Sequence, residues 1–240
     1  MSTLEELPAD ISFEAWISHI FDHDDPDWHW DLDVPLWDEE AEPQRTLEFL
    51  NRLFEAPEFL VAQFTLNQIG AGLNFLVNNS CSNYAFVLLN HSLPIEDRTR
   101  CLKNIATIYE TVLAKICLPV PHHNLQKWPP GYTKADSLCF MFWDEFPMYC
   151  HTRNHHGQPL KVIENEEDNS KIEAACLDAM ERTLAIDHIA CQEGALHGLG
   201  HWQMFYPERV VPIIDRYLAS SHAKPELTNY AQDARTGSVL

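Results

Sequence analysis

The clearest potential for chemistry in this 240-residue chain lies in three side chains of one predicted helix, His188–Phe205. Glu193, His197 and His201 stand at positions i, i+4 and i+8, within about 80° of arc on one helix face. Imidazole and carboxylate groups at this spacing can act as metal ligands. The glutamate precedes both histidines, however, so the His-Glu-x-x-His order of zinc-protease helices is absent.

The alternative is that His197 and His201 are hydrogen-bonded at a tight contact between helices. Three glycines in the same segment lower its helix propensity by roughly 1 kcal/mol each, and they indicate close approach of a neighbouring helix (Gly194, Gly198 and Gly200). We therefore predict that the two histidines are structural and that the chain holds no metal or other cofactor. A metal set of Glu193, His197 and His201 stays open as the alternative.

The second candidate site is an acidic stretch between Phe21 and Pro43. It holds ten carboxylates, no basic residue and three tryptophans, and neither a helical nor a strand period survives in it, so it predicts an ordered acidic loop. Tryptophans are unusual in disordered segments, and they could either anchor the loop or contact a partner. The residues that we expect to bind a partner are Asp22, Asp24, Asp25, Asp27, Trp28, Trp30, Asp31, Asp33 and Trp37.

Hard oxygen ligands at this density could also bind Ca²⁺ or Mg²⁺, but the ligand order of a calcium loop is absent. A further combination of aromatic and acidic residues ends a predicted helix at Trp143, Asp144 and Glu145. This combination occurs where basic peptides are recognised. The alternative is a core tryptophan beside a solvated acidic turn.

Charge narrows the choice of partners. Thirty-six acidic against sixteen basic residues give a net charge of −20. Residues 1–60 hold seventeen acidic residues and only two basic ones, Arg45 and Arg52. Such a field repels nucleic acid phosphates and anionic lipids and attracts basic proteins. The sequence thus predicts a basic protein partner, with no direct nucleic acid binding and no membrane.

The elements that must position these residues are predicted to be helices. Apolar residues recur at steps of three and four over Ile172–Ile186, His188–Phe205 and Glu208–Leu218, and the short connectors indicate antiparallel neighbours. Hairpins of this length, with small residues inside and a proline in one helix, resemble HEAT-type α-solenoid repeats over residues 171–220. The resemblance implies an all-α fold of stacked antiparallel helical hairpins, and it implies no particular activity.

One α-helical domain is expected over residues 1–220. Within it, 118–133 is predicted to be a loop because it contains four prolines and a glycine, and polar residues 151–170 are predicted to be a linker. Residues 221–240 are predicted to be a poorly ordered tail. The N-terminus lacks the basic and apolar regions of a secretory signal, no apolar run is long enough to span a bilayer, and the seven cysteines show no pairing pattern. These features predict a cytoplasmic protein with free thiols.

Two classes of function remain. The first is a non-enzymatic acidic protein-binding module, of the kind that immunity proteins and inhibitors of basic proteins represent. The second is a metal-dependent hydrolase that uses histidine and acidic ligands. The charge and the absence of nucleotide-binding, kinase and serine-hydrolase motifs favour the first.

Overall fold

The computed structural model describes residues 10–31, 34, 41–146 and 166–239, and these form helices and connecting turns without a strand. The prediction of an all-α protein is confirmed for this part of the chain. The α-helices are α1 Phe13–Phe21, α2 Pro43–Glu55, α3 Phe59–Gln63, α4 Leu66–Val77, α5 Ile95–Lys103, α6 Ile105–Ile108, α7 Ala114–Ile116, α8 Lys134–Glu145, α9 Glu166–Leu184, α10 Ile189–Gln203, α11 Pro207–Leu218 and α12 Thr228–Thr236. Short 3₁₀ helices occur at Trp28–Trp30, Tyr84–Leu89 and Pro225–Leu227, and Tyr109–Leu113 is a π-helical turn.

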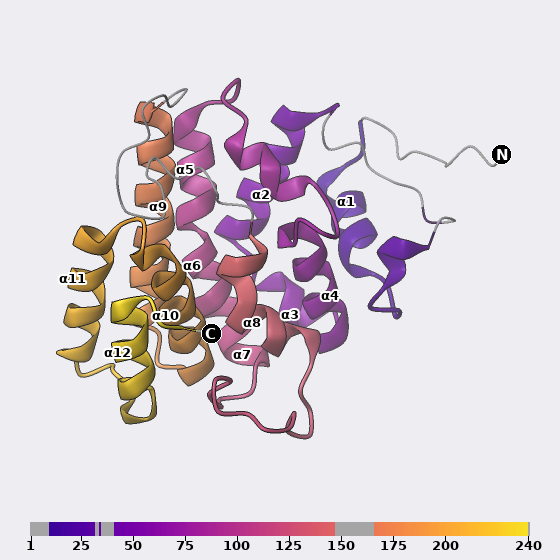
Figure 1. Ribbon diagram of the computed structural model, residues 1–240. Coiled ribbons are helices and arrows are strands. Elements are labelled where there is room, and N and C mark those ends of the chain that lie inside the picture. Colours follow the sequence, from indigo (N-terminus) through magenta and orange to yellow (C-terminus); the bar gives the residue numbers. More distant parts are fainter. Residues whose placement is uncertain (1–9, 32–33, 35–40, 147–165, 240) are drawn as a thin grey trace.

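The helices pack around two central elements, α8 and α10 (Figure 1). α8 packs between α4 and α10, whereas α10 also contacts α9, α11 and α12. In Figure 1, α5 and α9 run side by side, and α11 and α12 form the corner of the molecule beside α10. α10 is buried along nearly its whole length, and only His201 and Gln203 reach solvent. The core therefore surrounds α10, which carries the histidines singled out from the sequence.

Glycines determine how closely the helices approach α8 and α10. A Cβ atom at Gly70 of α4 would lie 2.6 Å from the backbone nitrogen of Ala135 in α8, and one at Gly194 of α10 would lie 2.0 Å from the carbonyl oxygen of Cys139. Carbon atoms in ordinary contact stay about 3.5–4.0 Å apart. Only glycine therefore permits α8 to lie this close to both α4 and α10.

The segment predicted to be a poorly ordered tail is instead helical over much of its length. Residues Pro225–Leu227 form a 3₁₀ turn and continue into α12, with the apolar face Leu227, Tyr230, Ala231 and Ala234 buried against the body. Polar composition misled the prediction, because the apolar stripe is short and half of its side chains are small alanines. α12 ends at Gly237, which adopts the left-handed conformation that favours glycine (φ 72°).

The predicted linker over residues 151–170 also ends earlier than expected. α9 already begins at Glu166, and Asp168 in its first turn pairs with the fully buried guanidinium of Arg98 at 2.6 Å. The rest of the predicted linker lies outside the described residues.

The loop predicted at 118–133 contains no helix or strand, and the six described cysteines are free thiols. Among the described helices, none has the length and apolar character needed to cross a membrane.

Candidate functional site

The first half of the candidate site is the last turn of α8. The helix begins with a capping box, in which the backbone N–H and hydroxyl of Thr133 both donate to Asp136 Oδ2 at 2.7 and 2.8 Å. The other oxygen of the buried Asp136 accepts the N–H of Leu118 at 2.7 Å. These bonds fix the start of α8, and the length of the helix then places Asp144 one residue before its end.

The second half of the site is α10, which crosses α8 at two glycines one turn apart. Gly194 faces the Cys139 carbonyl, and a Cβ atom at Gly198 would lie 2.6 Å from Cγ of Trp143. Trp143 is the residue before Asp144, and Gly198 is the residue after His197. The close contact between the helices therefore brings Asp144 to the face of α10 that carries its two histidines.

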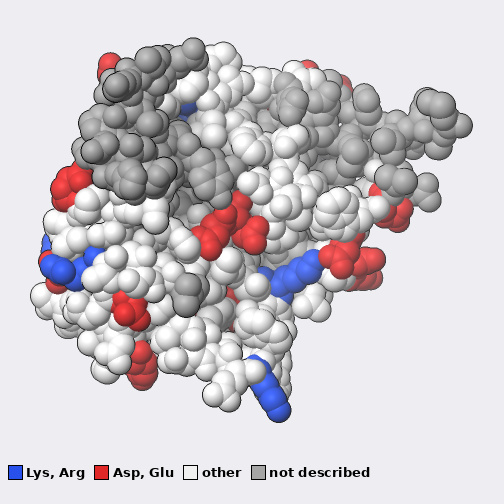
Figure 2. All heavy atoms as spheres, viewed as in Figure 1, with Lys and Arg blue, Asp and Glu red and all other residues white. Residues whose placement is uncertain are grey.

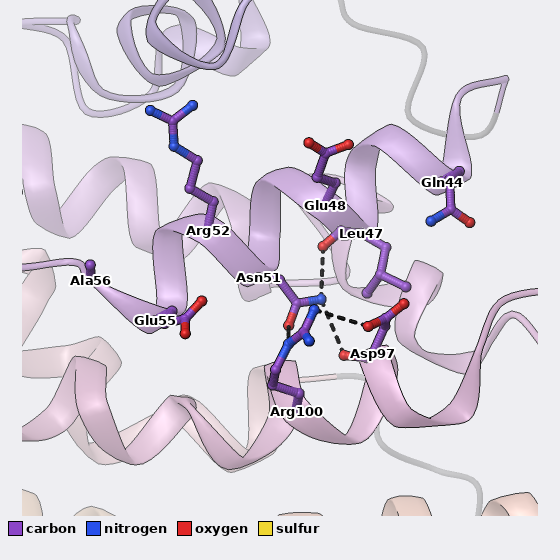
Figure 3. Close-up of a pocket in the computed structure, with 9 residues that line it drawn as sticks. All are labelled: Gln44, Leu47, Glu48, Asn51, Arg52, Glu55, Ala56, Asp97 and Arg100. Atoms are coloured by element: carbon purple, nitrogen blue, oxygen red, sulfur yellow. Dashed lines mark hydrogen bonds and ion pairs between the residues drawn. The ribbon is translucent and has the colours of Figure 1, made fainter.

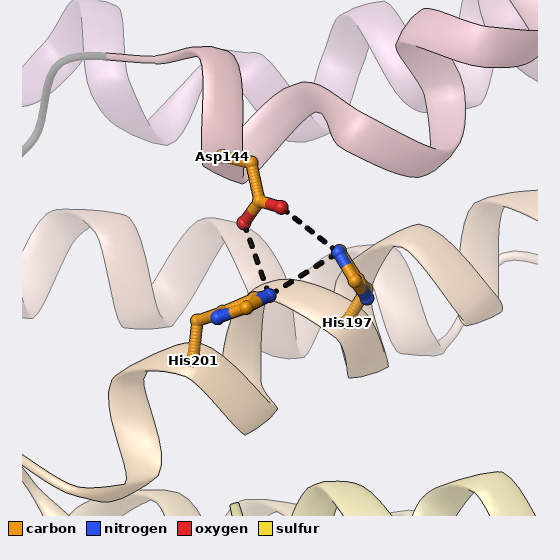
Figure 4. A group of neighbouring side chains, drawn as sticks. All are labelled: Asp144, His197 and His201. Carbon is orange, nitrogen blue, oxygen red and sulfur yellow. Dashed lines mark hydrogen bonds and ion pairs between the residues drawn. The ribbon is translucent and has the colours of Figure 1, made fainter. Parts of the chain in front are cut away.

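Asp144, His197 and His201 converge there (Figure 4). His197 Nε2 lies 3.0 Å from Oδ2 of Asp144, and His201 Nε2 lies 3.3 Å from Oδ1 of the same carboxylate. The two imidazole Nε2 atoms are 3.3 Å from each other. Among the described residues, this is the one group of three or more potential metal-ligating side chains whose ligand atoms come so close together.

The triangle of ligand atoms has the size that a transition-metal ion requires. Zinc binds histidine nitrogen and carboxylate oxygen at about 2.0–2.2 Å, so two tetrahedral ligands stand about 3.3 Å apart. Octahedral ligands at similar bond lengths stand about 3.0 Å apart, as in iron sites with two histidines and one carboxylate. The observed separations of 3.0, 3.3 and 3.3 Å thus fit either geometry without movement of the helices.

Hydrogen bonds alone cannot make all three contacts of this triangle attractive. In a neutral imidazole, Nε2 offers either one N–H or one lone pair, so hydrogen bonds can make at most two of the three contacts attractive. If both histidines donate to Asp144, their two N–H groups lie side by side at 3.3 Å. A cation at the centre of the triangle would make all three groups ligands. The geometry of the cluster therefore admits a metal ion as well as a hydrogen-bonded arrangement.

The three side chains of the cluster differ in burial, and burial affects the protonation of His201. The side chain of His197 is only 2% exposed, whereas His201 is 44% and Asp144 25% exposed. Burial lowers the pKa of His201; Asp144 raises it, and His197 lowers it further. The lowered pKa keeps the His201 imidazole neutral at neutral pH, which leaves a lone pair for a metal. The site is closed toward the core and open toward solvent.

A second layer of contacts holds His197 in place. Its Nδ1 atom lies 2.6 Å from the hydroxyl of Tyr230 in α12, and its ring packs against Phe140 at 4.2 Å between centroids. Burial raises the pKa of the Tyr230 hydroxyl, so the group stays protonated. Metal-binding histidines usually have such a partner on the nitrogen that does not face the ion.

Glu193 does not join the two histidines, although it lies on the same helix. Its fully buried carboxylate accepts the backbone N–H groups of His122 and His123 at 2.5 and 2.8 Å, and it pairs with His123 Nδ1 at 2.5 Å. The loop over residues 118–133 is thereby fastened to α10. The ligand set suggested by sequence spacing, Glu193 with His197 and His201, is thus replaced by one in which Asp144 supplies the carboxylate.

Two residues of this site were not assigned to it from the sequence. Asp144 was considered only as part of a site for basic peptides, since no local pattern links it to histidines more than fifty positions away. Tyr230 was missed because it lies in the segment predicted to be a poorly ordered tail. The available signal was the pair of glycines at Gly194 and Gly198, which indicated a close helix contact at the level of the histidines.

The acidic stretch is described in part. Asp22 ends α1 and accepts from Gln68 at 3.4 Å, Asp25 accepts the N–H of Asp27, and Asp27 pairs with Lys134 at 2.7 Å. Asp24 and Asp31 are exposed. Asp33 and Trp37 lie outside the described residues. On the face in Figure 2, acidic side chains form several separate groups, and most basic side chains in view lie beside one of them.

The tryptophans of this stretch have different environments. Trp28 is buried, with the ring of His23 stacked on it at 4.0 Å and Phe75 at 4.6 Å. Of the two roles considered for the tryptophans, the burial of Trp28 favours anchoring, so this residue offers little to a partner although it was among the residues expected to bind one. Trp30 is 67% exposed and remains a candidate contact residue.

A groove of about 500 Å³ lies between α2 and α5 (Figure 3). Asn51 donates to the carbonyl oxygens of Leu47 and Asp97 at 3.0 and 3.1 Å and accepts from Arg100 at 3.2 Å. Arg100 also pairs with the Asp97 carboxylate at 2.9 Å. Because these central polar groups satisfy one another, the groove has no convergent set of groups for a ligand.

The fold and the site together define an all-helical protein with a candidate centre of two histidines and one aspartate. No protein family, curated protein sequence or solved structure matches the chain. A functional assignment therefore rests on the geometry of the site.

Proposed function

We propose that the protein is a metal-dependent enzyme in which Asp144, His197 and His201 bind one divalent transition-metal ion. The observation that carries the proposal is the triangle of ligand atoms with sides of 3.0, 3.3 and 3.3 Å. The proposal departs from our sequence-based expectation of structural histidines and a binding module without a metal. It takes up the alternative of a metal-dependent hydrolase with a different carboxylate.

A metal site with three protein ligands is typical of catalytic sites and not of structural ones. Structural zinc sites close all four positions with protein groups, whereas catalytic sites keep a position for water or substrate. Here, the partial exposure of His201 and Asp144 supports a site whose remaining positions would face solvent. A zinc ion in such a site lowers the pKa of its bound water to about 7 and so supplies a nucleophile for hydrolysis.

Metal content and its dependence on His201 test the proposal. We expect about one metal ion per chain in protein purified without chelators, and recovery of this stoichiometry when zinc is added back after chelation. His201→Ala should abolish binding, and the exposed histidine of His222→Ala is the matched control. His201 is the suitable target because it is half exposed, so its removal spares the core, in contrast to His197.

Chromogenic esters and phosphoesters then serve as probes of hydrolysis by the zinc-loaded protein. Activity that requires metal and is lost in His201→Ala would support the hydrolase. Iron in place of zinc would redirect the assay to oxygen-dependent reactions, for which the same ligand set is known. Wild-type protein that binds neither metal would refute the proposal, and the cluster would then be a hydrogen-bonded contact.

The second candidate function is binding of a basic protein through the acidic stretch, as expected from the sequence. It is favoured by the 67% exposure of Trp30 beside the exposed carboxylates of Asp24, Asp25 and Asp31. An exposed aromatic ring within an acidic field suits contacts with lysine and arginine side chains. In this function the protein acts as an immunity or inhibitor-type module, and the helical hairpins over 171–220 serve as a HEAT-like scaffold.

A lysine-rich peptide is the probe for this second function, and the chain offers a matched control. Trp128 is also 67% exposed, but it lies in loop 118–133 next to Lys127. Trp30→Ala should weaken peptide binding, whereas Trp128→Ala should not. Replacing Asp24, Asp25 and Asp31 by Asn should reduce both the association rate and its dependence on salt. Equal binding by all variants would exclude this surface.

A further inference from the structure

The C-terminal helix α12 contributes one hydroxyl group to the candidate metal centre. Tyr230 is buried, and its hydroxyl oxygen lies 2.6 Å from Nδ1 of His197. The flat face of the tyrosine ring is covered by His123, with 4.5 Å between centroids and 19° between planes. His123 is itself held by Glu193 through Nδ1. Tyr230 is thereby fixed from both sides at the nitrogen of His197 that faces away from Asp144.

Binding of a metal requires a particular tautomer of His197. With Nε2 as a ligand, the neutral ring must carry its hydrogen on Nδ1, and this N–H can then donate to the oxygen of Tyr230. Without a metal, the hydrogen belongs on Nε2, where it is donated to Asp144 at 3.0 Å. In that state Nδ1 is a lone pair and accepts from the tyrosine hydroxyl.

A hydroxyl group is suited to both states, since it can donate one hydrogen bond and accept others. A carboxylate or a backbone carbonyl at the same place could only accept, and it would fix the metal-binding tautomer permanently. Because His197 is almost wholly buried, an unpaired nitrogen would be costly in either state. The hydroxyl of Tyr230 avoids that cost by rotation of its O–H bond, because it donates to Nδ1 in one state and accepts from Nδ1–H in the other.

We infer that Tyr230 is a positioning residue of the metal centre, whose hydrogen bond to His197 reverses direction when a metal binds at Nε2. The inference rests on the proposed function. It extends that function by making the C-terminal helix part of the metal centre. Outer partners of this kind typically change metal affinity by 10–100-fold when they are removed.

Zinc affinity of the full chain and of Tyr230→Phe provides the first measurement. We expect Tyr230→Phe to bind zinc about 10–100-fold more weakly than the wild type. The matched control is Tyr217→Phe. The hydroxyl of Tyr217 is likewise buried and donates to Gln192 Oε1 at 2.8 Å, but it has no contact with the three ligands. Thermal unfolding of both variants checks that each remains folded under the conditions of the zinc assay.

The tautomer of His197 provides a readout that a merely structural role would not move. In ¹⁵N-histidine NMR spectra at one fixed pH, metal-free wild type should show His197 protonated at Nε2. Zinc-loaded wild type should show it protonated at Nδ1, with Nε2 bound to the metal. In Tyr230→Phe, the metal-free preference for Nε2–H should weaken, because no donor then faces Nδ1.

The outcomes separate this inference from the proposed function. If the wild type binds zinc and Tyr230→Phe binds it equally well, the inference is overturned while the metal centre stands. The inference is likewise overturned if zinc leaves the His197 tautomer unchanged. If the wild type binds no metal at all, the proposed function itself fails and the inference fails with it.

Discussion

The contact between Gly198 and Trp143 offers the sharpest test of how the site is assembled. Gly198→Ala adds one methyl group to α10, and its carbon would lie 2.6 Å from Cγ and 2.7 Å from Cβ of Trp143. Cβ of Trp143 is bonded directly to the backbone of α8, so rotation of the side chain cannot move it away from the added carbon. The two helices must therefore separate until the contact reaches about 3.5 Å, which is an opening of roughly 1 Å.

Two opposing effects determine the loss of stability. Overpacking of a buried contact costs about 1–3 kcal/mol, and the rigid neighbour places this position near the upper end. Replacing glycine by alanine inside a helix returns roughly 1 kcal/mol. We thus expect the free energy of unfolding to fall by about 2 kcal/mol, as measured by denaturant titration.

The effect on the site should be larger than the effect on stability suggests. Asp144 follows Trp143, so an opening of roughly 1 Å would move its carboxylate from 3.0 Å to about 4 Å from His197 Nε2. At that distance the two ligands no longer stand at the separation of tetrahedral or neighbouring octahedral positions around an ion with bond lengths of about 2.0–2.2 Å. Zinc affinity of Gly198→Ala should accordingly drop by at least tenfold.

Gly200→Ala is the control on the same helix. The three atoms nearest to its added carbon all belong to the side chain of Val239, with Cγ2 at 2.5 Å, and none of the three belongs to α8. We expect this variant to bind zinc like the wild type. If Gly198→Ala retains both stability and zinc affinity, the reasoning that the glycine contact sets the distance between Asp144 and the histidines is wrong.

Three further predictions concern the rest of the molecule. Burial lowers the pKa of His19 to about 4, with nearby His23 as a second cause. The unfolded chain takes up this proton near pH 6.5, whereas the folded chain takes it up only near pH 4. The free energy of unfolding should therefore fall by roughly 2–3 kcal/mol as the pH is lowered from about 6.5 to about 4. His19→Gln should remove that part of the pH dependence in denaturant titrations. Leu196 is fully buried, as its position on the predicted helix face implied, and Leu196→Ala should cost about 2–5 kcal/mol; a cost below about 0.5 kcal/mol would contradict its place in the core. Glu193→Gln should weaken the charge-assisted bonds to His122 and His123 and cost about 3 kcal/mol, and limited trypsin digestion at Lys127 should accelerate if those bonds hold the loop.

Periodicity in the sequence was sufficient to predict the helix that carries the two histidines. The spacing over 188–205 predicted α10 to within two residues at each end, and the glycines indicated that a neighbour comes close. Helices are decided largely by nearby residues, so their signal is local. The predicted loop at 118–133 followed in the same way from its prolines.

The composition of the site could not be predicted in the same manner. Glu193 lies on α10 itself, whereas Asp144 lies on α8. Only the packing of α8 against α10 decides which of these two carboxylates contacts the histidines. Tyr230 depends on the docking of α12, whose alanine-rich face gives a weak apolar signal. Similarly, Trp28 and Trp30 are two positions apart and looked alike in the sequence, yet one is buried and the other is 67% exposed.

The enclosure of α10 by α8, α9, α11 and α12 has a consequence for the order in which a metal would be captured. A helix with almost no solvent face opens only when its neighbours separate, so its backbone amides should exchange with solvent hydrogen mainly through global unfolding. Asp144, by contrast, lies in the last turn of α8, where helix ends fray. A metal would therefore meet the two imidazoles as a fixed pair of ligands, and Asp144 would be the ligand whose position fluctuates. Native-state hydrogen exchange would show this as slow amides around His197 and fast ones at the end of α8, with zinc slowing only the latter.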